Sequence, residues 1–140
     1  MVILTFNEEK HIRRSVESVK HFAKRIVVLD SFSNDKTESI CQSLGVDFFQ
    51  NKWKNYATQF NYALDNTDIN TEWIMRLDAD EYLDKVLISD IESNVIKSQS
   101  HDGFLVNRVM SFMGKTLRFG GMSNYYMLRI WRAGLGRCEQ

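Results

Sequence analysis

The sequence predicts an α/β fold with an open, mostly parallel sheet flanked by helices. Two observations predict it. Short apolar runs alternate with segments of helical periodicity through the first two thirds of the chain, and polar residues follow the apolar runs. The length of 140 residues suits one compact domain. We expect a single domain with a helix-and-strand half over 1–100 and a strand-rich region over 101–140.

The chain opens with a predicted strand, helix and second strand. Residues 2–5 form a short apolar run. From Glu9 onwards, apolar residues recur at helical spacing, at Ile12, Val16, Val19 and Phe22. Residues 26–29, Ile-Val-Val-Leu, are continuously apolar, which is typical of a strand buried on both faces.

The remaining elements follow in alternation. Residues 31–35 have the composition of a turn, and the helix after it should stop at Gly45, a common helix terminator. The predicted order is helix 36–44, strand 46–49, helix 56–64, strand 73–77, helix 88–96, and strands 104–106 and 127–131.

Polar residues come directly after three of the predicted strands. In open α/β sheets, ligands bind at the carboxyl ends of the strands, where the loops gather. The fold therefore predicts a site along one sheet edge, formed by Asn7 and Glu8, Asp30 and Ser31, and Asp78 and Asp80.

Asp78 and Asp80 are separated by one small residue. Two carboxylates this close repel each other unless a cation or a proton lies between them. Mg²⁺ is usually held by one or two carboxylates together with substrate phosphates. The pair thus predicts a metal that bridges the protein and a diphosphate, although a solvated turn would show the same spacing. For Asp30, a contact with a base or ribose and a turn-forming role both remain open.

The composition argues against several classes of partner. Eighteen basic and eighteen acidic residues cancel, so no long-range field favours nucleic acid. No apolar run approaches the roughly 20 residues that span a bilayer. The two cysteines, Cys41 and Cys138, make no disulfide framework, and we expect a cytoplasmic setting.

The order and spacing of several segments resemble one family. The chain is similar to family-two inverting glycosyltransferases of the GT-A fold, especially bacterial enzymes of lipopolysaccharide-core and capsule assembly. Residues 1–100 would be the nucleotide-sugar-binding half, and 101–140 the start of the acceptor-side region. The segments that carry the resemblance are 2–9, 26–37, 55–64, 73–81, 112–115, 120–121 and 128–132.

The resemblance implies roles for individual residues. Asp80 would coordinate manganese or magnesium, and Asp78 would approach the ribose or diphosphate. The other implied nucleotide-binding residues, for a nucleoside that is usually uridine, are Thr5, Asn7, Glu8, Asp30, Gln59 and Asn61.

The sequence departs from the family at two places. Leu4 stands where a proline often precedes the first-loop threonine. Many members carry a Glu-Asp pair after the strand at 128–132, and one of its acids deprotonates the acceptor; here Glu139 is followed by Gln140. Either Glu139 is this general base or the base lies beyond residue 140, and we expect the chain to be truncated.

The expected reaction is a metal-dependent, inverting transfer from a nucleotide sugar to a glycan or lipid-linked acceptor. We expect the enzyme to make peripheral contact with the inner face of the cytoplasmic membrane.

Three alternative functions compete with this one. A sugar-1-phosphate nucleotidyltransferase would show a glycine-rich phosphate loop instead of Asn-Glu-Glu-Lys at 7–10. An aspartyl phosphatase would carry threonine or valine where Tyr82 stands. A non-catalytic nucleotide-sugar-binding domain would bind the donor without transferring it.

Overall fold

The computed structural model describes residues 1–112, 115–116 and 125–139. Two pairs from the acceptor-side region of the resemblance, 113–114 and 120–121, lie outside the described residues. Within the described ranges, no helix is long and apolar enough to cross a membrane.

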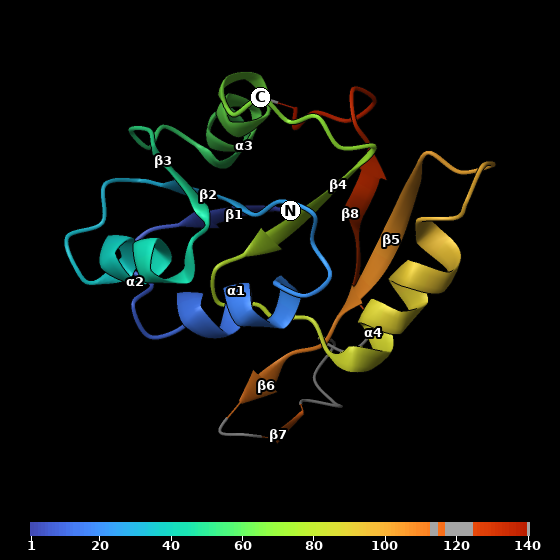
Figure 1. The fold of residues 1–140 in the computed structure, drawn as a ribbon, viewed down its shortest axis with the longest axis horizontal. Coiled ribbons are helices and arrows are strands. Elements are labelled where there is room, and N and C mark those ends of the chain that lie inside the picture. The colour runs from blue at the N-terminus through green and yellow to red at the C-terminus, as the bar shows by residue number, and fades with distance from the viewer. Residues whose placement is uncertain (113–114, 117–124, 140) are drawn as a thin grey trace.

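The centre of the molecule is a six-stranded sheet (Figure 1). Its first four strands in spatial order are parallel, whereas the fifth is antiparallel to both of its neighbours. Across the sheet the order is β3 (Asp47–Gln50), β2 (Val27–Asp30), β1 (Val2–Thr5), β4 (Trp73–Asp78), β8 (Tyr125–Arg132) and β5 (Gly103–Arg108). A separate two-stranded antiparallel ribbon pairs β6 (Ser111–Phe112) with β7 (Lys115–Thr116). The expected mostly parallel α/β sheet is therefore confirmed, with an antiparallel insertion at β8.

Helices cover both faces of the sheet. Figure 1 shows α3 (Tyr56–Asn66) on one side, with α1 (Ile12–Val19) and α2 (Thr37–Leu44) on the other. The side of α1 and α2 also receives α4 (Lys85–Asp90) and the π-helical turn η1 (Ile91–Val95).

Two apolar clusters separate along the strands because successive strand residues point to opposite faces. On β1, Ile3 packs with the helices α1, α2 and η1, while Val2 and Leu4 pack with Phe60 and Ala63 of α3. The strand is buried on both faces, which explains its continuous apolar run.

Capping residues set the helix ends. Helix α2 ends at Gly45, whose positive φ of 67° lets its N–H donate to the Gln42 carbonyl, as the sequence predicts. The helix expected over 88–96 begins earlier, at Lys85, because the Asp84 side chain accepts a hydrogen bond from the Leu87 N–H.

Candidate functional site

The carboxyl ends of β1, β2 and β4 meet at one edge of the sheet. Thr5 is paired in register with Asp30, and Leu4 with Asp78. The residues after these strands therefore do lie along one edge, as the sequence predicts. What each side chain does there differs from residue to residue.

The loops after β1 and β2 are held together by hydrogen bonds. The Asn7 side-chain oxygen accepts from the Asn34 N–H at 2.9 Å, and the Asn7 N–H donates to the Ser33 hydroxyl at 2.7 Å. The Glu8 N–H donates to the Thr37 hydroxyl at 2.9 Å. Asn7 has a positive φ of 53°, which asparagine tolerates better than most residues. The first loop is thus fixed in place against the second.

Asp30 has no exposed surface. Its carboxylate accepts hydrogen bonds from the Ser33 N–H at 2.8 Å, from the Ser33 hydroxyl, and from the Gln50 amide at 3.1 Å. These contacts make Asp30 the residue that shapes the turn after β2. A direct contact with a nucleoside stays a prediction, and it would require Ser33 or Gln50 to move away.

Thr5 and Glu8 differ in what they offer a ligand. Thr5 is 5% exposed, and its hydroxyl has no hydrogen-bond partner among the described residues. The Glu8 carboxylate is partly exposed and contacts the His11 ring at 2.7 Å. The Thr5 hydroxyl therefore has a free hydrogen-bonding capacity just below the loop surface.

The side chain of Gln59 is hydrogen-bonded within the protein and does not face solvent. Gln59 is completely buried. Its amide donates to the Ser31 hydroxyl and to the Asn51 carbonyl, both at 3.1 Å, and accepts from the Asn51 side chain at 2.9 Å. The polar atoms of its side chain join α3 to the loops after β2 and β3, and a contact between Gln59 and a nucleotide stays a prediction.

Asn61 is also engaged by the protein. Its side chain donates to the Cys138 carbonyl at 2.9 Å and accepts from the Cys138 N–H at 3.0 Å. Sequence reasoning placed Asn61 in the nucleotide pocket, whereas the structure uses it to hold the segment 133–139, here called the C-terminal segment. Two further contacts fix that segment: Arg137 pairs with Asp65 of α3 through both oxygens at 2.7 Å, and Gly136 lies against the Trp131 indole. Exposed Glu139 follows directly.

We expect Asn61→Ala to release the C-terminal segment. The substitution removes two hydrogen bonds and leaves the Cys138 backbone without its partner, so the free energy of unfolding should fall by about 1–3 kcal/mol. Hydrogen exchange at the Cys138 amide should quicken in the same variant. Asn66→Ala is the matched control, since Asn66 lies on the same helix and its side chain donates, among the described residues, only to the carbonyl of Tyr62, four residues earlier. Unchanged exchange at Cys138 would contradict the role given to Asn61.

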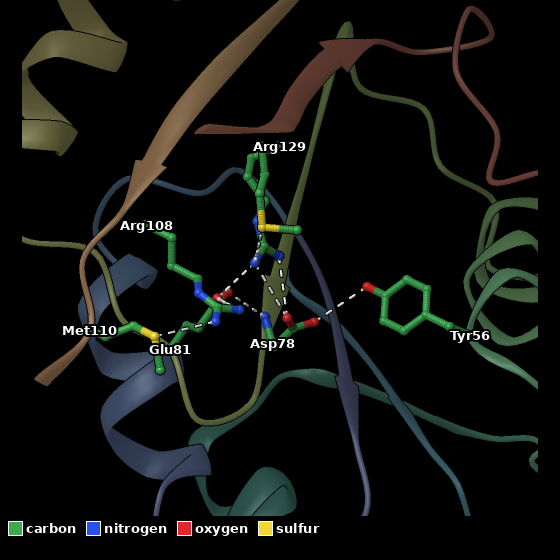
Figure 2. A network of polar contacts seen from close by, with 7 residues as sticks. Tyr56, Asp78, Glu81, Arg108, Met110 and Arg129 are labelled. Atoms are coloured by element: carbon green, nitrogen blue, oxygen red, sulfur yellow. Dashed lines mark hydrogen bonds and ion pairs between the residues drawn. The ribbon is translucent and has the colours of Figure 1, made fainter. Parts of the chain in front are cut away.

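The carboxylate of Asp78 is half-buried in a polar network (Figure 2). One oxygen accepts from the Tyr56 hydroxyl at 3.3 Å, and the other faces both terminal nitrogens of Arg129 at 3.4 Å. Arg129 also donates to Glu81 at 2.7 Å, and Glu81 accepts from the Asp78 N–H at 3.1 Å. Asp78, Glu81 and Arg129 thus form one closed cluster.

Burial raises the pKa of two titratable groups in this network. Burial, followed by the negative charge of Asp78, raises the pKa of the Tyr56 hydroxyl, so that Tyr56 remains a neutral donor near pH 7. Burial likewise raises the pKa of Glu81, and the Asp78 N–H and the Arg129 charge oppose that rise.

Asp80 differs from Asp78 in being exposed. Within the described part of the chain, no hydrogen bond or ion pair engages its carboxylate. Its backbone is nevertheless fixed, because the Arg14 guanidinium donates to the Asp80 carbonyl at 3.1 Å and lies 4.7 Å from the Tyr82 ring centroid. The side chain of Asp80 is therefore free for a ligand while its loop is held.

The oxygen ligands that this loop offers suit a hard divalent cation. Asp78 and Asp80 offer carboxylate oxygens on one loop, which suits Mg²⁺ or Mn²⁺ when substrate phosphates complete the coordination. Among the described residues, no group of three or more acidic, histidine or cysteine side chains could hold a metal by itself. An ion here would take further ligands from substrate phosphates or water.

Sequence reasoning missed three residues of this site: Tyr56, Glu81 and Arg129. A signal for Arg129 exists, since it is an isolated charge between apolar neighbours in a strand-like segment. Nothing in the sequence pairs it with an acid 51 residues away.

The model of the family described as glycosyl transferase family 2 matches residues 1–137. The chain belongs to this family. It is 38% identical over 107 residues to an uncharacterized glycosyltransferase of Rickettsia bellii, covering 76% of this chain and 35% of the relative. It is 31% identical over 142 residues to the lipopolysaccharide core biosynthesis glycosyltransferase LpsC of Rhizobium meliloti, covering 98% of this chain and 52% of the relative. In these two alignments the chain spans about a third to a half of the relative's length.

Solved structures with the GT-A glycosyltransferase fold share this architecture. Glucosyl-3-phosphoglycerate synthase from Mycobacterium tuberculosis, in complex with UDP, superposes with a TM-score of 0.61 at 16% identity, covering 73% of this chain and 41% of that chain. TarS of S. aureus in complex with UDP-GlcNAc superposes with a TM-score of 0.56 at 22% identity, covering 69% and 30%. These similarities confirm the predicted GT-A fold of this family 2 chain.

Proposed function

We propose that this chain forms the donor-binding part of a metal-dependent glycosyltransferase. The enzyme transfers a sugar from a nucleoside diphosphate, with UDP-sugar as the expected donor, to a glycan or lipid-linked acceptor. The observation that carries the proposal is the loop after β4, where Asp80 presents a free, exposed carboxylate next to Asp78. Donor binding is assigned to residues 1–100 and the start of the acceptor side to 101–140.

The fixed loops after β1 and β2 suit recognition of a nucleoside. Their rigidity means that little conformational entropy is lost when a ligand binds. The partly exposed Glu8 carboxylate is the group that would face it, and the buried Thr5 hydroxyl, which has no partner among the described residues, would lie beneath it. Asp30, buried below the turn, would act by holding that turn in shape.

Asp80 would hold the metal, with Asp78 beside it. When bound, Mn²⁺ or Mg²⁺ would offset the negative charge of the departing diphosphate. The Tyr56 hydroxyl and the Arg129 guanidinium keep the Asp78 carboxylate oriented.

Glu139 is the proposed general base. Its carboxylate would take the proton of the acceptor hydroxyl as that oxygen attacks the anomeric carbon. The C-terminal segment that carries it is held on α3 by Asn61 and Arg137. Attack opposite the leaving diphosphate would invert the anomeric configuration, an outcome proposed from the family resemblance.

The proposed function also implies a cellular role and a location for the enzyme. Likeness to LpsC supports a role in lipopolysaccharide or other cell-surface polysaccharide synthesis. We therefore propose a cytoplasmic enzyme with peripheral contact at the inner face of the cytoplasmic membrane.

Isothermal titration with UDP tests the donor site. We expect UDP to bind in the presence of Mn²⁺ and to bind at least about tenfold more weakly after chelation with EDTA, because the diphosphate would then face Asp78 and Asp80 without a cation between them. ADP serves as the matched nucleotide control for the uracil preference. Absence of UDP binding with Mn²⁺ present would contradict the proposed donor site. Donor binding without transfer to any glycan acceptor would instead support the non-catalytic interpretation of this chain.

A further inference from the structure

We propose that Arg129 is a positioning residue for the metal-binding loop, residues 78–81. In this inference, which rests on the proposed function, Arg129 holds Asp78 and Glu81 inward so that Asp80 is left free to bind the cation. Arg129 comes from the acceptor-side half of the chain, so it joins the two halves at the point where donor and acceptor would meet.

The burial of Arg129 supports this role. Its side chain is only 5% exposed, while those of Asp78 and Glu81 are 30% and 18% exposed. A guanidinium taken out of water to this extent is costly unless carboxylates pair with it. Here it reaches two of the three acids of the loop: the Glu81 oxygen lies at 2.7 Å and the Asp78 oxygen at 3.4 Å (Figure 2).

The geometry of the guanidinium also matters. Both of its terminal nitrogens face the same Asp78 oxygen, while one of them donates to Glu81. A lysine ammonium at this position would be a single point charge and could not span the two acids in the same way. The planar fork therefore fixes the distance between the first and the fourth residue of the loop.

The charge balance of the loop explains why one of its acids stays free. Asp78, Asp80 and Glu81 place three carboxylates within four residues. Arg129 offsets one of these charges, and Arg108 of β5 lies 3.9 Å from Glu81 as a second cation. Glu81 additionally accepts from the Asp78 N–H, which closes the turn. The one carboxylate of the three without a partner among the described residues is that of Asp80, which is exposed.

Arg132 offers a matched control on the same strand. It too pairs with carboxylates, those of Glu72 and Asp102, and its guanidinium lies 4.5 Å from the Trp73 ring centroid. These contacts are at the opposite end of β4 from the metal-binding loop. Removing Arg132 thus removes a comparable ion pair without touching the loop.

The test is the Mn²⁺ concentration that half-saturates UDP binding, measured by titration for Arg129→Met and Arg132→Met. Groups that orient a metal ligand typically contribute about 10–100-fold in metal affinity, and Arg129 would act on Asp80 through the loop that its contacts with Asp78 and Glu81 hold in place. We expect Arg129→Met to raise the half-saturating Mn²⁺ concentration by about that factor and Arg132→Met to change it less than about twofold. Arg129→Lys should fall between wild type and Arg129→Met, because it keeps the charge but loses the fork.

Glu81→Gln keeps the test decisive should Arg129→Met fail to fold. This variant preserves side-chain shape and removes the charge that anchors Arg129, and circular dichroism would verify its fold. We expect it to raise the Mn²⁺ requirement by about tenfold or more. A folded Glu81→Gln or Arg129→Met variant with the wild-type Mn²⁺ requirement, or with a lower one, would overturn the inference and leave the donor site standing. Wild-type protein that shows no Mn²⁺-dependent UDP binding would overturn both.

Discussion

Replacing Asp80 with alanine is expected to abolish the Mn²⁺-dependent part of UDP binding. Asp80 carries the exposed carboxylate of the loop after β4, and no partner within the described residues competes for it. Changes to groups around a metal ligand cost about 10–100-fold in metal affinity, so loss of the ligand itself should raise the Mn²⁺ concentration that half-saturates UDP binding more than about 100-fold. Titration with Mn²⁺ at fixed UDP measures the effect.

Asp90→Ala is the matched control for this experiment. Asp90 is an exposed aspartate, the last residue of α4, and lies outside the loop 78–81. Its removal changes the net charge by the same amount, so it reports any general electrostatic effect on nucleotide binding. Equal weakening in both variants would contradict the assignment of Asp80 as metal ligand, as would unchanged binding in Asp80→Ala.

Replacing Glu139 with glutamine is expected to lower the rate of sugar transfer by about 10²–10⁴-fold, the usual contribution of a general base. The amide cannot take the acceptor proton at neutral pH, but it keeps nearly the same shape. Donor binding should therefore stay within about twofold of wild type. UDP release from a UDP-sugar, with a glycan acceptor or water, measures the rate.

Glu92→Gln provides the comparison, because Glu92 is also exposed but lies in η1. A Glu139→Gln variant that transfers as fast as wild type would show that another group takes the proton.

Local patterns in the sequence were sufficient to predict much of the fold. The apolar run 26–29 and the helical spacing of Ile12 to Phe22 depend on burial within a few residues. Both elements form, the strand one residue later at Val27–Asp30 and the helix ending earlier, at Val19. The rule that ligands bind at the carboxyl ends of parallel strands then brought Asp30 and Asp78 to the same edge, which the strand register confirms. The expected helix over 88–96 began too late because the pattern ignored the cap at Asp84.

The hydrogen-bond partners of individual polar side chains could not be predicted from the sequence. Gln59 and Asn61 lie on one helix and read as candidates for the same pocket, yet one holds the loops after β2 and β3 and the other holds Cys138. A polar side chain bonds whatever segment the folded chain brings within about 3 Å, and that segment can be distant in sequence.

Residue types and the alternation of strands with helices were therefore enough to predict an acidic edge on an α/β sheet, where we propose that a metal binds. The different states of Asp78 and Asp80 depend on the packing of β8 beside β4, which delivers Arg129 from 51 residues away. Burial of apolar side chains drives this packing. The Arg129 guanidinium is buried along with them, which is costly unless carboxylates pair with it. Long-range strand pairing leaves no periodic signal in the sequence, so the partner of Asp78 became visible only in the folded chain.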